Sequence, residues 1–108
     1  MHRHREFSAA SREALGLFAL RVRAARRERR MRAAEVAERV GVSLTTVRKV
    51  ERGDPTVALG TAFEVATIVG VALFGEDRQR RAQEAEYLTT RLTVLPDAVR
   101  HPRVDNDF

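Results

Sequence analysis

An all-α fold is predicted for this chain of 108 residues, and two patterns between residues 33 and 52 predict it. The first pattern is a pair of short amphipathic segments whose valines and alanines recur on one face. The second is the glycine between them, because Gly41 can take the left-handed conformation that ends a helix, and Ser43 can then cap the next one. Two helices joined by such a turn form a helix-turn-helix, whose second helix suits the major groove of DNA.

The helix that precedes this motif is expected from Leu15 onward. Phe18, Val22 and Ala25 follow Leu15 at intervals of three or four residues, which places all four on one helical stripe. Residues 1–14 are mostly polar, and we expect either a loose arm or an early extension of the same helix.

The two helices of the motif are expected over residues 33–40 and 44–52. Their apolar faces consist of Val36, Ala37 and Val40 in the first helix and of Val47 and Val50 in the second. The sequence Gly53-Asp54-Pro55 then ends the second helix, because proline has no N–H to donate and glycine accepts the left-handed conformation.

A further helix is expected to begin near Gly60 or Thr61 and to end near Gly70. Its stripe consists of Leu59, Ala62, Phe63, Ala66 and Val69, and a short apolar plug of Val71, Leu73 and Phe74 follows. The domain that carries the motif is therefore expected to span residues 15–75.

Residues 76–108 are expected to form a C-terminal extension. Residues 76–92 are charged and predict a helix with a thin apolar seam, which consists of Ala82, Ala85, Leu88 and Leu92. From Thr93 onward an extended chain is expected, because Pro96 and Pro102 exclude a helix. The seam makes residues 76–95 the expected elements of a homodimer.

The charge of the chain is concentrated at one end. Residues 1–32 carry ten arginines against three glutamates, whereas the rest of the chain is close to neutral. A localised cationic surface attracts nucleic acid by releasing its condensed counterions. The alternative is that these arginines only solvate the outer faces of helices.

The start of the second motif helix is expected to face the bases of double-stranded DNA. Its residues Leu44, Thr45, Arg48 and Lys49 lie opposite Val47 and Val50 in helical projection. Leu44 can contact a thymine methyl group, Thr45 a base or a phosphate, and Arg48 and Lys49 guanine or the backbone. Ser43 is expected to cap the helix and contact a phosphate. The alternative is that these are ordinary exposed residues of a surface helix.

Catalysis and cofactor binding are not expected. The chain has no cysteine, only three histidines and no glycine-rich phosphate loop, so we expect neither an enzyme, nor a metal site, nor a cofactor. Glu51 is instead expected to pair with a basic residue of the first helix, for which Arg26 is the candidate. No apolar run approaches the roughly 18 residues of a membrane span, and we expect a cytoplasmic, nucleoid-associated protein.

Residues 17–74 resemble the Xre and lambda-repressor type of helix-turn-helix domain. The residues that carry the resemblance are Arg21-Val22-Arg23, Val36-Ala37-Glu38, Gly41-Val42-Ser43, Thr46-Val47 and Val50-Glu51-Arg52-Gly53. The resemblance implies a five-helix DNA-binding fold and a transcriptional repressor.

Three neighbouring positions depart from the pattern of that family. The family commonly has glycine, a serine or threonine cap, and glutamine where this chain has Arg30, Arg32 and Ala33. The loss of the cap costs the following helix about 1 kcal/mol. The loss of the glutamine removes an amide that in relatives contacts the DNA backbone, a contact that Arg32 can replace with its charge.

Two further segments resemble HipB-like antitoxins more specifically. They are residues 52–61 and the sequence Leu95-Pro96-Asp97-Ala98-Val99-Arg100, which leads into an acidic tail that ends in phenylalanine. This resemblance implies an autoregulating homodimer that binds a HipA-like serine/threonine kinase toxin. The alternatives are a stand-alone repressor without a toxin and a module that uses the same fold to bridge proteins.

The tail has two expected roles. Residues Leu92 to Val99 can add a strand to the same segment of a second subunit. Val104 and Phe108, together with neighbouring carboxylates, suit a basic, apolar-lined cleft of a partner kinase. A disordered acidic tail that keeps a basic protein in solution is the alternative.

Overall fold

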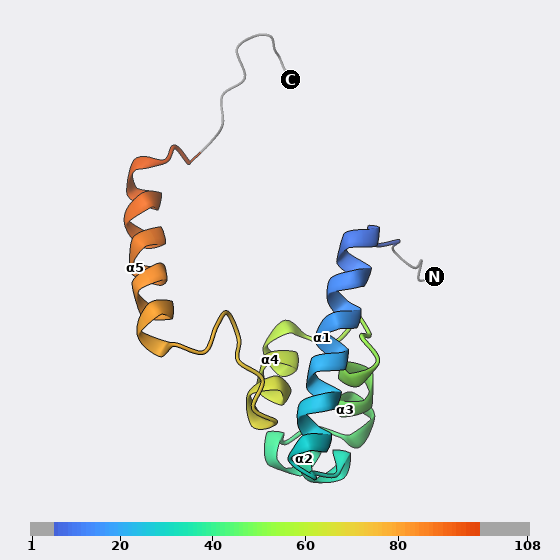
Figure 1. Ribbon diagram of the computed structural model, residues 1–108. Coiled ribbons are helices and arrows are strands. Elements are labelled where there is room, and N and C mark those ends of the chain that lie inside the picture. The colour runs from blue at the N-terminus through green and yellow to red at the C-terminus, as the bar shows by residue number, and fades with distance from the viewer. Residues whose placement is uncertain (1–5, 98–108) are drawn as a thin grey trace. The chain divides into compact units, whose positions relative to one another are not determined.

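Five helices make up the computed structural model, which describes residues 6–97 (Figure 1). They are α1 (Ala9–Glu28), α2 (Ala33–Val40), α3 (Leu44–Glu51), α4 (Leu59–Ile68) and α5 (Arg78–Val94). No strand occurs in the described part of the chain, so the predicted all-α class is confirmed. The chain divides into two compact units between Leu73 and Phe74.

The core of the first unit is built from small aliphatic side chains. Each of its four helices contributes at least one fully buried valine, and these are Val22, Val36, Val47, Val65 and, just after α4, Val69. Helix α3 packs against α1, α2 and α4, so it is held on several sides although it has only eight residues. An isolated helix of that length is not stable in water, and packing therefore determines where α3 lies.

The α3–α4 turn approaches α1 closely at Gly53. The backbone φ of Gly53 is +75°, and a β-carbon at this position would lie 3.1 Å from the carbonyl oxygen of Leu15. Only glycine avoids both the left-handed strain and the close contact. The carboxyl end of α3 is thereby held against the middle of α1.

Helix bounds agree with the sequence for α2 and α3 and differ at the two ends of the chain. Helix α1 begins at Ala9, where the hydroxyl of Ser8 accepts a hydrogen bond from the N–H of Ser11 at 3.2 Å. Residues 9–14 therefore belong to the early helical extension rather than to a loose arm. Their side chains are exposed, which explains why no apolar stripe reveals them.

The expectation of an extended chain from Thr93 onward is wrong for two residues. Thr93 and Val94 belong to α5, and Leu95 is the first residue with extended backbone. Proline restricts the residue before it more than residues further upstream, so Pro96 ends the helix at Val94. The strand expected over Leu92 to Val99 is therefore wrong for Leu92 to Val94, which are helical. Residues 98–99 lie outside the described part of the chain.

The apolar plug after α4 is only partly correct. Val71 and Leu73 pack against the core of the first unit. Phe74 is 79% exposed and has a backbone φ of 61°, so it is not part of that core. None of the described helices is both long and apolar enough to cross a membrane.

Candidate nucleic-acid interface

Helix α3 begins immediately after a tight turn that two residues define. Gly41 adopts φ +86° at the carboxyl end of α2, which an L side chain would disfavour. The hydroxyl of Ser43 then accepts a hydrogen bond from the N–H of Thr46 at 3.1 Å and caps α3. The predicted glycine turn and serine cap are both confirmed.

The outward face of α3 carries the side chains that the sequence singled out. Leu44, Thr45 and Arg48 are exposed, and Lys49 is half-buried. Val47 and Val50 are buried on the opposite face. The helix therefore presents two cations, a hydroxyl and an aliphatic side chain to solvent, which together suit phosphate oxygens, base edges and thymine methyl groups.

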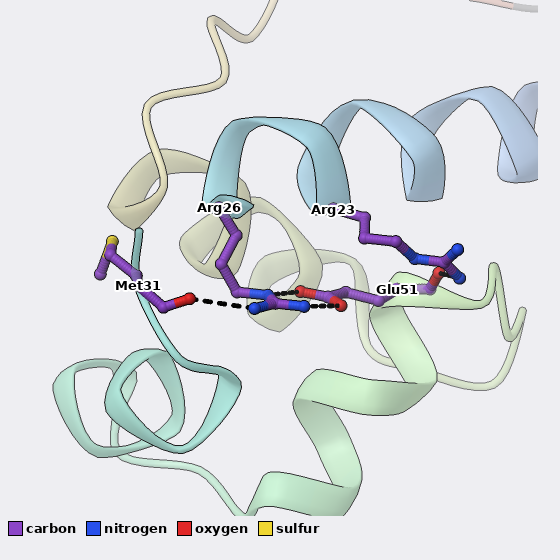
Figure 2. Close-up of polar contacts among 4 residues, drawn as sticks. All are labelled: Arg23, Arg26, Met31 and Glu51. Carbon is purple, nitrogen blue, oxygen red and sulfur yellow. Dashed lines mark hydrogen bonds and ion pairs between the residues drawn. The ribbon is translucent and has the colours of Figure 1, made fainter. Parts of the chain in front are cut away.

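The carboxyl end of α3 is held by an ion pair between buried Glu51 and half-buried Arg26, which the sequence predicts. Arg26 of α1 donates to both carboxylate oxygens of Glu51, from Nε at 2.5 Å and from Nη2 at 3.0 Å (Figure 2). Its Nη1 donates to the carbonyl oxygen of Met31 at 2.9 Å. The hydrogen bond that Arg26 donates to the Glu51 carboxylate raises the pKa of Arg26, so the guanidinium is charged at every physiological pH. One side chain thus joins α1, the α1–α2 turn and α3.

Arg23 has a different role from the one that its charge suggests. Its place among the arginines of the basic N-terminal third predicts a contact to the DNA backbone. Its Nη2 instead donates to the carbonyl oxygen of Glu51 at 2.9 Å (Figure 2), and its side chain is half-buried. Arg23 satisfies an acceptor at the carboxyl end of α3, where cations also interact favourably with the helix dipole.

Residues 22–74 match a family model described as helix-turn-helix, HTH_3. These residues form a lambda-repressor-like helix-turn-helix domain. A domain of this family is a DNA-binding module of transcription regulators. Comparisons of the chain with curated proteins and with solved structures gave no match.

The amino end of α2 contains Arg32 and Ala33, two of the positions at which the sequence departs from the pattern of the family. Arg32 occupies the N-cap position with extended backbone, and its side chain makes no capping hydrogen bond. Arg32 is exposed, whereas Ala33 is 8% exposed and belongs to the core. Of these two positions, only Arg32 is placed to contact a ligand of the helix-turn-helix domain.

A shallow hollow beside α3 contains candidate contacts that the sequence did not reveal. It has a volume of about 270 Å³, and Lys49, Thr46, Thr56 and Thr61 contribute its polar lining. Hydroxyl and ammonium groups are typical contacts to DNA phosphates. Thr56 and Thr61 come from the α3–α4 loop and α4, and no pattern in the sequence places a loop beside a helix.

The remaining predicted site residues are at the end of the chain. Val104 and Phe108, expected to bind a partner, lie outside the described residues.

Asp54, in the segment that resembles HipB-like antitoxins, accepts hydrogen bonds from the N–H and hydroxyl of Thr56 at 2.8 and 2.6 Å. The bond from the Thr56 hydroxyl is the main cause that lowers the pKa of Asp54.

Proposed function

We propose that this protein is a sequence-specific transcriptional repressor that binds a palindromic operator as a homodimer. The observation that carries the proposal is the exposed face of α3, on a helix whose carboxyl end Arg23 and Arg26 fix to α1. A rigid helix that presents Arg48 and Lys49 from a helix-turn-helix domain is suited to base reading in the major groove.

In this proposal some side chains recognise the base sequence of DNA and others contact its phosphate backbone. Leu44, Thr45, Arg48 and Lys49 face the bases, and Arg32 contacts a phosphate. The hydroxyl of Ser43 already accepts from Thr46 and lies 3.0 Å from the Thr46 hydroxyl. Ser43 therefore contributes chiefly as the cap of α3, and any phosphate contact is made in addition.

The proposal is tested by replacing the two cations of α3 with alanine. Arg48→Ala and Lys49→Ala should each weaken operator binding by about 1–3 kcal/mol and relax the preference at particular base pairs. Binding is measured by titration of an operator selected from a random duplex library, at fixed salt. Arg80→Ala removes the same charge from an exposed position of α5 and should leave specific affinity unchanged. Unaltered affinity in both α3 variants would contradict the assignment of α3.

Homodimer formation is proposed from the properties of α5. Within the second unit none of the 17 residues of α5 is buried, and a helix that stands alone is only marginally stable. Ala85, Leu88 and Leu92 of the predicted seam follow one another at intervals of three and four, as in the repeat of a coiled-coil seam. A second copy of α5 would cover this seam. One recognition helix contacts few base pairs, so a dimer with half-sites about 34 Å apart also provides the specificity that a monomer lacks.

The finer proposal is that the protein is the autoregulating antitoxin of a HipA-like kinase. It is supported by the resemblance of residues 52–61 and 95–100 to HipB-like antitoxins and by the acidic, apolar composition of the tail. Deletion of residues 103–108 should abolish binding to a HipA-like kinase, because Val104 and Phe108 are removed, and should leave DNA affinity unchanged. Kinase binding is measured by calorimetry with the full-length chain as the control. Unchanged affinity of the truncated chain for that kinase would exclude a docking role of the tail.

A further inference from the structure

The turn between α1 and α2 presents two arginines from a firmly held position. Met31, between them, is 9% exposed and packs in the core. Its carbonyl oxygen accepts the hydrogen bond from Arg26, which also binds Glu51 of α3 (Figure 2). Arg30 and Arg32 on either side are exposed. Both are thus held at a fixed place relative to α3.

Both positions carry a residue that costs stability. Arg30 has φ 57°, in the left-handed region where glycine is strongly favoured over residues with a β-carbon. Arg32 is the N-cap of α2 and makes no side-chain capping bond, whereas serine, threonine, aspartate or asparagine would make one. Glycine at the first position and serine at the second would therefore give a more stable fold.

Interactions within the chain do not explain these arginines. In residues 6–97 neither side chain makes a hydrogen bond or an ion pair. Arg23 and Arg26 differ in this respect, because both donate hydrogen bonds to Glu51. Residues that cost stability without a partner in the fold are typical of functional sites.

We propose that Arg30 and Arg32 form a paired contact to the phosphate backbone of the operator, retained at the expense of stability. Two guanidinium groups separated by one buried residue suit neighbouring phosphates, which guanidinium binds through charge-assisted hydrogen bonds. This inference rests on the proposed function, and it adds Arg30, where the related domains commonly have glycine, to the DNA-binding residues. Because phosphates carry no sequence information, the pair should strengthen binding to every sequence alike.

The test measures stability and DNA binding in the same variants. Arg30→Gly and Arg32→Ser should each raise Tm by a few degrees, since strain is relieved or a cap is gained. Each should also weaken binding to the selected operator and to an arbitrary duplex by a similar factor, roughly five- to tenfold near 0.1 M salt. The slope of log K against log salt should fall by about 0.9 for each phosphate that the variant no longer binds. Arg30→Lys keeps the charge and should keep most of the salt slope.

The outcomes separate this inference from the proposed function. Arg80→Ala, which removes one charge from α5, is the control and should change neither Tm nor slope. If the wild type binds DNA and the two variants bind with unchanged affinity and slope, this inference is overturned while the proposed function stands. If the wild type shows no salt-dependent DNA binding, the proposed function fails. Lower Tm in both variants would also overturn the inference, because the arginines would then serve the fold.

Discussion

The variant Glu51→Gln is expected to lower the free energy of unfolding by about 1–3 kcal/mol, because it leaves the half-buried charge of Arg26 without a counter-charge. The side chains of Arg26 and Glu51 are only 14% and 9% exposed, so water compensates for the missing carboxylate less than it would on the surface. The carbonyl oxygen of Met31 and the amide oxygen of the new glutamine could still accept hydrogen bonds from Arg26, but neither carries a negative charge. Urea denaturation measures the change.

A matched control is available on the surface of α2. Glu35 and Arg39 form an ion pair at 3.1 Å whose side chains are 36% and 57% exposed. Exposed pairs of this kind contribute about 0.3–0.5 kcal/mol, so Glu35→Gln should be nearly neutral. Equal and small losses of stability in both variants would show that the buried pair does not stabilise the fold.

The double variant Leu88→Glu/Leu92→Glu is expected to reduce operator affinity by about 10²–10⁴-fold. Four carboxylates in the α5 seam of a dimer would be buried without partners, so the subunits should separate. Each subunit would then bind one half-site without the effective concentration that the second subunit provides. Sedimentation measures the association, and titration of the selected operator measures affinity.

The control for this variant lies on the opposite side of α5. Thr90→Glu adds a similar charge to the helix but lies away from the seam of Ala85, Leu88 and Leu92 in helical projection. It should leave both association and affinity unchanged. A wild-type chain that sediments as a monomer at micromolar concentration, free and on DNA, would contradict the dimer.

Local chemistry explains what the sequence could predict. Gly41, Ser43 and the valine periodicity are short-range signals, and they placed α2 and α3 correctly. The pairing of Arg26 with Glu51 was also predictable, because a buried carboxylate at that position requires a cation from the helix that packs against it.

The features that the sequence could not predict depend on distant or graded effects. The charge of Arg23 suggested a DNA contact, but which carbonyl its guanidinium reaches depends on how α1 packs against α3. The start of α1 carries no apolar stripe because the side chains of its first turns are exposed, so Ala9 gave no signal. Pro96 indicated the end of α5 but not its exact residue, since the restriction decays within one or two positions upstream.

The hydrogen bonds of Arg23 and Arg26 also determine how the DNA-reading surface can open. Helix α3 cannot leave the first unit unless α1 releases both the carboxylate and the terminal carbonyl of Glu51. Local fraying that would expose the amides of α3 therefore requires the same opening that exposes the core. We therefore expect the amide hydrogens at the carboxyl end of α3 and in the carboxyl half of α1 to exchange with solvent as one cooperative unit, so that the proposed DNA-reading surface opens only together with the core.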